Sequence, residues 1–310
     1  MTNRQQRPSV SIVGAGRLGS SLAVALETAG YQIDALVARR KAKARRALRL
    51  LDGKVLALAQ QDLNHLPPSK LIFISTPDDA IEDVAGVLAD LQTGDPTGRV
   101  FLHTSGALSS AALEPLAEKG FAVGSLHPLA AVSDPQKGAD SLRGAFWCVE
   151  GDRFAVKVAR RIVNDLKGKS FSITADKKPL YHAAAVMVSG HAVALFDIAI
   201  EMLAQTGLTE AKARKILLPL VESNARNLAT VKPARALTGS FARGDLATVQ
   251  RHLGALSVSG LKDALHVYRF LGVRSLKLAK ETKADPQALK QIAELLESEQ
   301  HEDPEDEGTR

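Results

Sequence analysis

The stretch that most constrains this fold is a glycine-rich turn within residues 10–20. Gly14, Gly16 and Gly19 have the spacing of a dinucleotide-binding fingerprint, with an apolar run before them and a helical pattern after them. The first glycine permits a tight turn, the second lets the backbone approach a pyrophosphate, and the third lets helix pack on strand. A glycine turn without a ligand is the less favoured alternative, because a second strand pattern completes the unit. The predicted phosphate cradle consists of Gly14, Ala15, Gly16, Arg17, Leu18 and Gly19.

The type of nucleotide depends on the end of the second predicted strand, residues 31–37. Asp34 lies within that strand, whereas its tip is followed by Arg39 and Arg40. A carboxylate at the tip would bind the ribose hydroxyls of NAD, while guanidinium groups bind a 2′-phosphate through charge-assisted hydrogen bonds. The sequence therefore predicts NADP(H) as the cofactor, with Arg39 as the first candidate ligand of the 2′-phosphate and Arg40 as the second.

Polar residues also follow predicted strands at 71–75, 100–102 and 121–126. The carboxyl ends of parallel strands line the ligand crevice of such a sheet, so we expect these residues near cofactor or substrate. Helix capping alone also accounts for the first group, and a single histidine is more often structural than chemical. We predict cofactor contacts from Ser75, Thr76, Pro77, Thr104 and Ser105, and substrate contacts from His103 and His127.

The chain is predicted to contain two domains and a tail. Strand patterns continue to residue 173, and only helical patterns follow Pro179. We predict a doubly wound, mostly parallel α/β Rossmann domain at residues 1–175 and an all-α substrate and dimerisation domain at 176–297. Residues 298–310 are acidic and are predicted to be disordered.

Composition excludes several classes of protein. The single cysteine, Cys148, lies in an apolar run, which excludes an internal disulfide framework and suits a reducing cytoplasm. The histidines lack metal-site spacing, so no metal is predicted. No stretch of about 18 uncharged apolar residues and no signal peptide is found, so we expect a cytoplasmic protein without a membrane partner. The basic run at 39–49 lacks interleaved aromatic residues, so no nucleic-acid partner is predicted.

Several motifs together resemble a set of NADP-dependent oxidoreductases whose C-terminal half is a domain of unknown function, DUF2520. The motifs are the glycine turn, Ser75-Thr76-Pro77-Asp78, His103-Thr104-Ser105-Gly106, Ser125-Leu126-His127-Pro128, Lys178-x-x-Tyr181-His182-Ala183-Ala184-Ala185-Val186, and Ala236-Leu237-Thr238-Gly239 with Arg243-Gly244-Asp245. The resemblance covers nearly the whole chain and implies a C-terminal domain of the 6-phosphogluconate-dehydrogenase-like type. Pyrroline-5-carboxylate reductases, ketopantoate reductases, β-hydroxyacid dehydrogenases and prephenate dehydrogenases share this architecture, with substrate bound between the domains.

The resemblance also implies catalytic residues. Lys178-x-x-Tyr181 takes the place of the Lys-x-x-Asn of β-hydroxyacid dehydrogenases, in which the lysine assists proton transfer and the asparagine orients the substrate. Here Tyr181 and His182 replace the usual asparagine pair, which argues against a hydroxyacid substrate. The candidate catalytic residues are Lys178, Tyr181, His182 and His127. The alternative is that Lys178 is a solvated residue at a helix start and Tyr181 a packed ring.

A second group of candidates lies between the later helical patterns. Arg243 is a candidate clamp for a substrate carboxylate, and Thr238 is a candidate hydrogen-bonding partner beside it. The alternative is a glycine turn with helix caps, held by an Arg243–Asp245 ion pair.

These observations predict an NADP(H)-dependent oxidoreductase that transfers a hydride to or from a small carbonyl, imine or hydroxy substrate. The alternative function is a non-catalytic NADP(H)-binding redox sensor or interaction protein on a reductase scaffold, because fold does not fix function. The apolar helical pattern at 183–203 predicts a homodimer.

Overall fold

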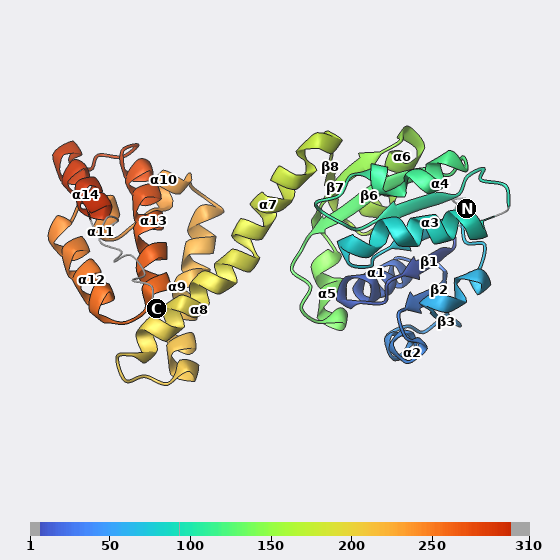
Figure 1. Ribbon diagram of the computed structural model, residues 1–310, viewed down its shortest axis with the longest axis horizontal. Coiled ribbons are helices and arrows are strands. Elements are labelled where there is room, and N and C mark those ends of the chain that lie inside the picture. Colours follow the sequence, from blue (N-terminus) through green and yellow to red (C-terminus); the bar gives the residue numbers. More distant parts are fainter. Residues whose placement is uncertain (1–6, 93, 299–310) are drawn as a thin grey trace, which may run out of the picture. The chain divides into compact units, whose positions relative to one another are not determined.

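The computed structural model describes residues 7–92 and 94–298 of the chain. The chain divides into two compact units, residues 1–190 and 191–310, which are described separately (Figure 1).

The first unit is built on an eight-stranded sheet with the order β3-β2-β1-β4-β5-β6-β7-β8. All neighbouring strands are parallel except β6 and β7, which are antiparallel. The predicted α/β Rossmann fold with a mostly parallel sheet is therefore confirmed. The strands are β1 (Val10–Val13), β2 (Ile33–Ala38), β3 (Leu56–Ala59), β4 (Leu71–Ile74), β5 (Val100–His103), β6 (Ala122–Leu129), β7 (Phe146–Gly151) and β8 (Lys169–Phe171).

Helices cover both faces of this sheet, which explains why its central strands are apolar throughout. One core cluster joins the sheet to α1, α2, α5 and α6, and the other joins it to α3 and α4. In β4, alternate side chains enter the two clusters, so all four residues are buried. The helices are α1 (Arg17–Thr28), α2 (Lys41–Leu48), α3 (Ile81–Leu91), α4 (Glu114–Glu118), α5 (Pro135–Leu142), α6 (Arg153–Asp165) and α7 (Lys178–Val188).

Strand β6 is longer than the sequence pattern predicts. Its pairing with β5 stops at Ser125, but its pairing with the antiparallel β7 continues to Leu129. His127 therefore lies within the strand, opposite Cys148, and not after its end as expected from the sequence. The partner strand explains the difference, because β7 supplies a ladder beyond the point where β5 ends.

The segment after β4 also differs from expectation. The alternative of simple helix capping would place Pro77 in a first helical turn, yet Pro77 is extended, with ψ of 152°. A 3₁₀ turn at Asp78–Ala80 follows, and α3 then begins at Ile81. No side chain caps the 3₁₀ turn, which itself contains the acidic Asp78 and Asp79.

The second unit consists of helices among the residues that the structure describes. Seven helices run from α8 (Gly190–Ala204) to α14, with α12, α13 and α14 sharing a buried core. The predicted helical C-terminal domain is confirmed. The others are α9 (Glu210–Leu228), α10 (Pro233–Ala236), α11 (Ser240–Arg243), α12 (Leu246–Val258), α13 (Lys262–Ala279) and α14 (Pro286–Ser298).

The apolar helical pattern at 183–203 is interrupted at Ser189, whose φ of −115° and ψ of −84° are not helical. The helical part begins near residue 175, as predicted, but α7 belongs to the first compact unit. The predicted domain limits differ from this division for that reason. Residues 299–310 of the predicted tail lie outside the described residues.

Residues 175–204 are long and apolar enough to cross a membrane, judged by length and composition alone. The expectation that no such stretch exists was too strict, because it required an uninterrupted apolar run and this segment includes Ser189 and His191. One such segment is weak support for a membrane location.

Candidate functional site

The glycine turn packs directly against the end of β4. Gly14 has a φ of +114°, and a Cβ on it would collide with the backbone of Ser75 and lie 2.7 Å from the Thr76 nitrogen. A Cβ on Gly19 would collide with the carbonyl oxygen of Gly14. A Cβ on Gly16, in contrast, would have no atom within 4 Å. Two glycines are thus required by the protein's own packing, while the third borders open space where a ligand can approach.

The tip of β2 lies beside this turn. The backbone nitrogens of Gly14 and Ala15 both donate to the carbonyl oxygen of Val37, at 2.9 and 2.8 Å. Arg39 and Arg40 follow immediately and are exposed, and α1 begins without a side-chain cap. Within the described chain, the first N–H groups of α1 and two guanidinium groups are therefore available at one sheet edge.

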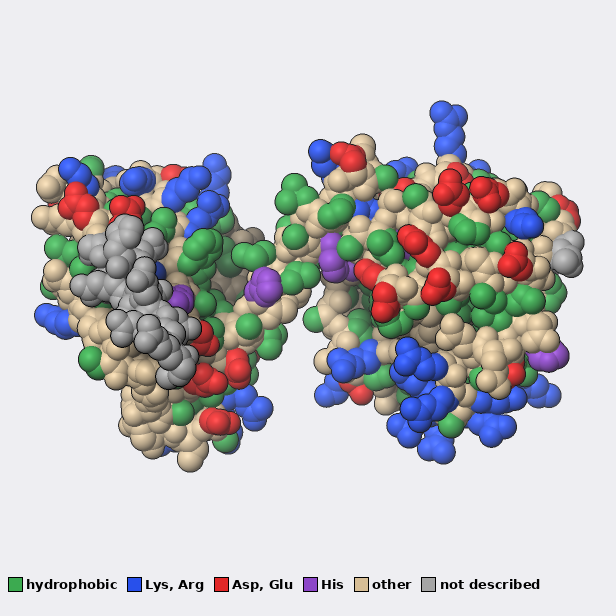
Figure 2. Space-filling model, in the orientation of Figure 1, with side chains coloured by type: hydrophobic (Ala, Val, Ile, Leu, Met, Phe, Trp, Pro, Cys, Tyr) green, Lys and Arg blue, Asp and Glu red, His purple; other side chains and the backbone are tan. Residues whose placement is uncertain are grey.

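Asp34 has a different role from an acid at the strand tip. It lies near the start of β2, and its carboxylate accepts a hydrogen bond from Ser69 Oγ at 2.5 Å. After Arg39 and Arg40 the basic residues continue in α2, whose exposed basic side chains are Lys41, Lys43, Arg45 and Arg46. Figure 2 shows Lys and Arg side chains gathered on this part of the first unit.

Residues after β4 and β5 interlock at the same edge. Thr104 Oγ1 donates to Ser75 Oγ at 3.0 Å, and Ser105 Oγ donates to the Asp78 carboxylate at 2.7 Å. The Thr76 hydroxyl is buried and has no hydrogen-bond partner in the described part of the chain. The structure thus brings together the predicted cofactor residues Ser75, Thr76, Pro77, Thr104 and Ser105 beside the glycine turn.

Lys178 is completely buried, although it begins a helix. Its Nζ donates to the carbonyl oxygen of Ser105 at 3.2 Å and to the hydroxyl of Ser125. Burial lowers the pKa of this amine. The lysine thus joins the start of α7 to the loop after β5 and to the middle of β6, and it is not the solvated residue of the alternative interpretation.

His103 has both ring nitrogens engaged within the protein. Its Nδ1 accepts from the Ser105 backbone nitrogen at 3.2 Å, and its Nε2 lies 3.0 Å from the carbonyl oxygen of Ser109. These partners define a neutral ring with the proton on Nε2. Burial, together with the Lys178 cation, lowers its pKa to about 4. No ring nitrogen is left for a substrate, so the geometry favours a structural role for His103.

His127 and Tyr181 form the accessible part of the cluster. The Nδ1 atom of His127 lies 2.7 Å from the Tyr181 hydroxyl, and both side chains are half-buried. Burial lowers the pKa of His127 to about 4, with smaller contributions from His182 and Lys178. Burial, and then the nearby Cys148, raises the pKa of Tyr181. Both groups are therefore neutral around pH 7.

His182 lies against His127, with ring centroids 5.4 Å apart and the planes at 83°. Its Nδ1 is buried and has no hydrogen-bond partner among the described residues. Gly106 lies between the two rings, because a Cβ on it would collide with His182 Nδ1 and lie 2.8 Å from His127 Nε2. The predicted residues His127, Tyr181 and His182 thus converge on one glycine.

The predicted substrate residues Thr238 and Arg243 belong to the second unit. Arg243 is exposed and pairs with Asp245 at 3.8 Å, as in the alternative interpretation of this loop. Asp245 also caps α12 by accepting from the Thr248 nitrogen and hydroxyl, which lowers the pKa of its carboxyl group. Their substrate contact stays a prediction.

Sequence reasoning placed Ser125 and Gly106 in motifs but gave them no role. Ser125 is the hydroxyl partner of a buried lysine 53 positions away, and Gly106 separates two imidazoles. Cys148 was interpreted as a buried strand thiol, and the structure places it in β7 opposite His127. The sequence offered one signal for these roles, which is the glycine at position 106 in the motif that begins with His103.

Two family models match most of the chain. Residues 2–128 match the Rossmann-like domain, and residues 145–275 match the domain of unknown function DUF2520. The chain therefore combines a Rossmann-like domain with a DUF2520 domain, and the resemblance inferred from the motifs is confirmed. Among proteins with curated functions, none matches the chain significantly.

Solved structures share the fold over nearly the full chain. A Bacteroides fragilis protein named as a candidate NADP oxidoreductase is 21% identical, with a TM-score of 0.71 over 88% of this chain and 99% of that one. A Thermotoga maritima protein is 25% identical, with a TM-score of 0.67 over 88% and 98%. A Plasmodium falciparum pyrroline carboxylate reductase with NADP bound is 11% identical, with a TM-score of 0.58 over 93% and 99%. A prephenate dehydrogenase of Aquifex aeolicus is 17% identical, with a TM-score of 0.50 over 88% of this chain and 98% of that one.

Proposed function

We propose that this protein is an NADP(H)-dependent oxidoreductase that acts on a small carbonyl, imine or hydroxy substrate. The observation that carries the proposal is the convergence of His127, Tyr181 and His182 at the sheet edge that also holds the glycine turn. The neutral imidazole of His127, the imidazole of His182 and the phenol of Tyr181 can exchange a proton with a reacting oxygen or nitrogen. The fold shared with NADP oxidoreductases supports the reaction class.

The residues around the glycine turn fit a dinucleotide. Open space borders Gly16, the start of α1 is uncapped, and the buried Thr76 hydroxyl lacks a partner in the described chain. We assign the pyrophosphate to residues 14–19 and the 2′-phosphate to Arg39 and Arg40, which follow β2 without an acid at the strand tip. When bound, the nicotinamide would supply the hydride chemistry.

Calorimetric titration with NADPH and NADH tests the cofactor. We expect NADPH to bind more tightly than NADH, and Arg39→Ala to weaken NADPH by about tenfold or more, because a charge-assisted bidentate contact is lost. NADH affinity should not change. Arg46→Ala removes an exposed guanidinium from α2 and is the matched control, with an expected change below about twofold. Absence of binding by either nucleotide would refute the proposal.

We assign the transfer of the proton to the residues of this cluster that are accessible. His127, Tyr181 and His182 are half-buried, whereas Lys178 is buried and donates to two serines. We therefore assign Lys178 a positioning role and His127, Tyr181 and His182 the contact with substrate. This division supports a screen of carbonyl and imine substrates with NADPH, in which His127→Asn should lower turnover by about 100-fold or more.

The buried amine also gives weight to the non-catalytic alternative, a redox sensor that binds NADP(H). In that case His127→Asn and Lys178→Ala should leave every substrate of the screen unreduced, as in the native protein, but should alter binding to a protein partner. Turnover of any substrate that is lost in His127→Asn would exclude this alternative.

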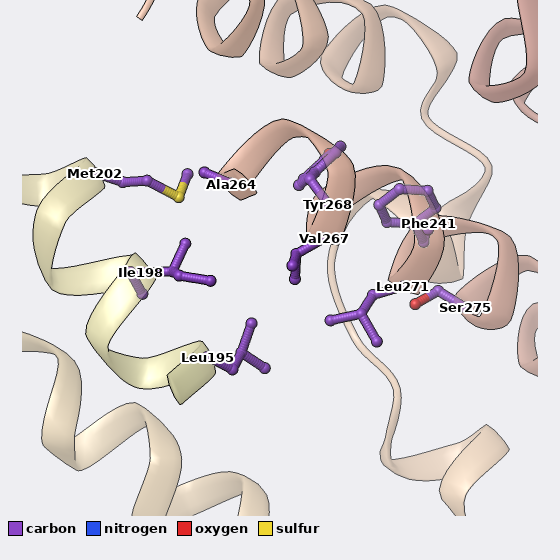
Figure 3. A pocket seen from close by; sticks show the side chains of 11 residues that line it. Leu195, Ile198, Met202, Phe241, Ala264, Val267, Tyr268, Leu271 and Ser275 are labelled. Carbon is purple, nitrogen blue, oxygen red and sulfur yellow. The ribbon is translucent and has the colours of Figure 1, made fainter. Parts of the chain in front are cut away.

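We further propose that a second copy of the chain covers α8. This helix is apolar and, in the described chain, contains no buried residue. Leu195, Ile198 and Met202 of α8 point toward Val267 and Leu271 of α13 across an apolar pocket of about 180 Å³ (Figure 3). Burying each large apolar side chain of α8 against a second copy would contribute about 1.5–3 kcal/mol to the free energy of association.

Light scattering over a range of concentrations tests this assembly. We expect the mass of a dimer at micromolar concentration without detergent, and recovery of the protein in the soluble fraction of the cytoplasm. A monomer would contradict the dimer. Recovery only with membranes would instead assign residues 175–204 to a bilayer.

A further inference from the structure

An exposed basic surface follows the tip of β2 and continues along α2 (Figure 2). Residues 39–49 contain seven Lys and Arg residues and no acidic residue, and all seven side chains are exposed. None of the seven forms an ion pair with another residue that the structure describes. The basic surface consists of Arg39, Arg40, Lys41, Lys43, Arg45, Arg46 and Arg49.

The basic side chains oppose the stability of α2 itself. Lys41 and Arg45 are four residues apart, so two like charges are neighbours on the helix. The first turn contains no acidic residue and has no side-chain cap, although the N-terminus of a helix favours negative charge. The buried residues of this helix are Ala44 and Ala47, so its packing does not require the charges. A helix that breaks these local rules without a structural gain indicates a binding function.

The proposed nucleotide uses only the beginning of this basic surface. The 2′-phosphate is assigned to Arg39 and Arg40, because one or two guanidinium groups are enough to bind a phosphate. Five further cations continue to Arg49, and residues 39–49 extend over about 15 Å when counted as helix. A row of cations of this length fits an extended polyanion rather than a single phosphate group.

The chain contains such a polyanion at its C-terminal end. Residues 299–310, which lie outside the described residues, contain six acidic residues and one arginine. Five of the six acidic residues lie within 302–307. Six residues of extended peptide span about 20 Å, which is comparable to the length of the basic surface. Because both belong to one chain, each basic surface is accompanied by one acidic segment at any protein concentration.

We propose that residues 299–310, of the same copy or of a second one, dock on the basic surface and compete there with the 2′-phosphate of NADPH. Their carboxylates neutralise the cations of α2 and pair with Arg39 and Arg40, which the 2′-phosphate requires. NADPH must then displace the acidic segment, whereas NADH carries no phosphate for these guanidinium groups. The competition rests on the proposed NADP(H)-dependent function, and the docking itself does not.

Nucleic acid is the other polyanion that a basic surface can bind. Proteins that bind single strands combine cations with aromatic side chains on which the bases stack, and residues 39–49 contain no aromatic residue. The acidic segment needs no such platform, because carboxylates pair with guanidinium and ammonium groups through charge alone. The composition of the basic surface therefore favours the acidic segment.

The first test locates the acidic segment and needs no nucleotide. A nitroxide spin label is attached to Gly308→Cys in the full-length chain, and the native Cys148 does not react because it is fully buried. In NMR spectra at about 20 mM salt, we expect the label to broaden the amide signals of α2, and at about 0.5 M salt the broadening should disappear, since charges are then screened within about 5 Å. Signals of α2 that stay sharp at low salt would overturn the proposal.

The second test compares two variants that each replace five carboxylates by amides in the full-length chain. The tail variant carries Glu302→Gln, Asp303→Asn, Glu305→Gln, Asp306→Asn and Glu307→Gln. The control variant changes five exposed acidic residues of α3 and α4, namely Glu82→Gln, Asp83→Asn, Asp90→Asn, Glu114→Gln and Glu118→Gln. The net charge changes equally in both variants, so only the position of the lost charge differs.

Calorimetric titration at low salt then measures the competition. The tail variant should bind NADPH about fivefold more tightly than the native protein, which is the factor expected if the acidic segment occupies the site about four-fifths of the time. The control variant should stay within about twofold of the native protein, and so should the affinity of the tail variant for NADH. Equal NADPH affinities of the native protein and the tail variant would overturn the competition.

These measurements separate a failure of this inference from a failure of the proposed function. Absence of NADPH and NADH binding by the native protein would refute the proposed function, while the spin label would still decide whether the acidic segment docks. Binding of NADPH together with sharp α2 signals would refute the inference alone. If such a protein also bound a short fluorescent DNA duplex at low salt, the basic surface would belong to nucleic acid and the proposal would be overturned.

Discussion

The two ends of α7 contrast sharply. Lys178 at its start is 0% exposed, whereas Val188 at its end is 80% exposed. A charged side chain is buried and an apolar one is in solvent, which reverses the usual distribution at both ends. The amine of Lys178 finds its hydrogen-bond acceptors within the chain, because Ser105 and Ser125 accept its hydrogen bonds. The other end has no such partner in the described chain.

This difference shows which parts of the molecule find their stabilising contacts within the chain and which need another surface. The desolvation of a buried amine is costly, and only hydrogen bonds from well-placed acceptors offset it. Exposed apolar residues near Ser189, by contrast, gain free energy only when another surface covers them. The start of α7 therefore reports on the first unit's own fold, and the end of α7 with α8 bears on the proposed assembly.

The largest expected effect concerns the exposed region. Val193 in α8 is 69% exposed, and Val193→Glu would place a carboxylate in the proposed dimer interface of each copy. Burying such a charge without a partner should weaken association by about 1,000-fold, or roughly 4 kcal/mol. Sedimentation equilibrium measures this change. Lys157→Glu, at an exposed position in α6, introduces a carboxylate outside the proposed interface and should leave the mass unchanged. Equal masses for all three proteins would contradict the proposed interface.

The next effect concerns the buried lysine. Lys178→Ala removes two hydrogen bonds and leaves a cavity, so the free energy of unfolding of the first unit should fall by about 3–4 kcal/mol. Urea denaturation followed by the fluorescence of Trp147, which is buried in β7, measures this loss. Lys177→Ala, an exposed neighbour, is the control and should change stability by less than about 0.5 kcal/mol. A small effect of Lys178→Ala would show that the amine contributes no net stability.

A pH dependence follows from the buried histidines. Burial lowers the folded-state pKa of His103 to about 4, so between pH 4 and 6.5 the unfolded chain binds more protons than the folded one. The stabilising contribution of neutral His103 is complete above pH 6.5 and is lost as the pH falls toward 4. The loss amounts to about 3 kcal/mol.

Urea denaturation at a series of pH values measures this loss. His103→Gln should have a shallower pH dependence, although His127 adds a slope of the same sign. Identical slopes in the native protein and the variant would contradict the assignment.

The smallest effect concerns a surface ion pair. Arg243 and Asp245 are 3.8 Å apart, and the Arg243 side chain is exposed, so the pair is screened by solvent. Arg243→Ala should change the free energy of unfolding of the second unit by less than about 1 kcal/mol. Asp245→Ala should cost more, because Asp245 also caps α12. Equal effects of the two changes in denaturation experiments would argue against this ranking.

Much of the first unit could be predicted from local patterns. The strand that precedes Gly14 and the apolar strand at Leu71–Ile74 have distinctive sequences, because both faces of these strands are buried. The end of β6 could not be predicted in this way. It depends on pairing with β7, about twenty residues later in the chain, and local patterns do not contain that information.

The residues of the site could be predicted from the sequence, whereas their arrangement in space could be predicted less well. His127, Tyr181 and His182 were identified from motifs, but their convergence on Gly106 depends on contacts between distant segments. The burial of Lys178 could not be inferred, because a lysine at a helix start is ordinarily solvated. The break at Ser189 was missed because its neighbours favour helix, which shows that propensity is a weak guide where packing decides.

The antiparallel pairing of β6 with β7 has a consequence for how His127 moves. Its backbone is held in a ladder with Cys148, so its peptide group should exchange hydrogen with solvent only when that part of the sheet opens. Its imidazole is therefore attached to a strand that is paired on this side, whereas Tyr181 and His182 lie on α7, about two turns before the break at Ser189. The buried Lys178 amine ties the start of α7 to the same unit, so hydrogen exchange of the His127 peptide should report opening of the sheet on which the whole cluster depends.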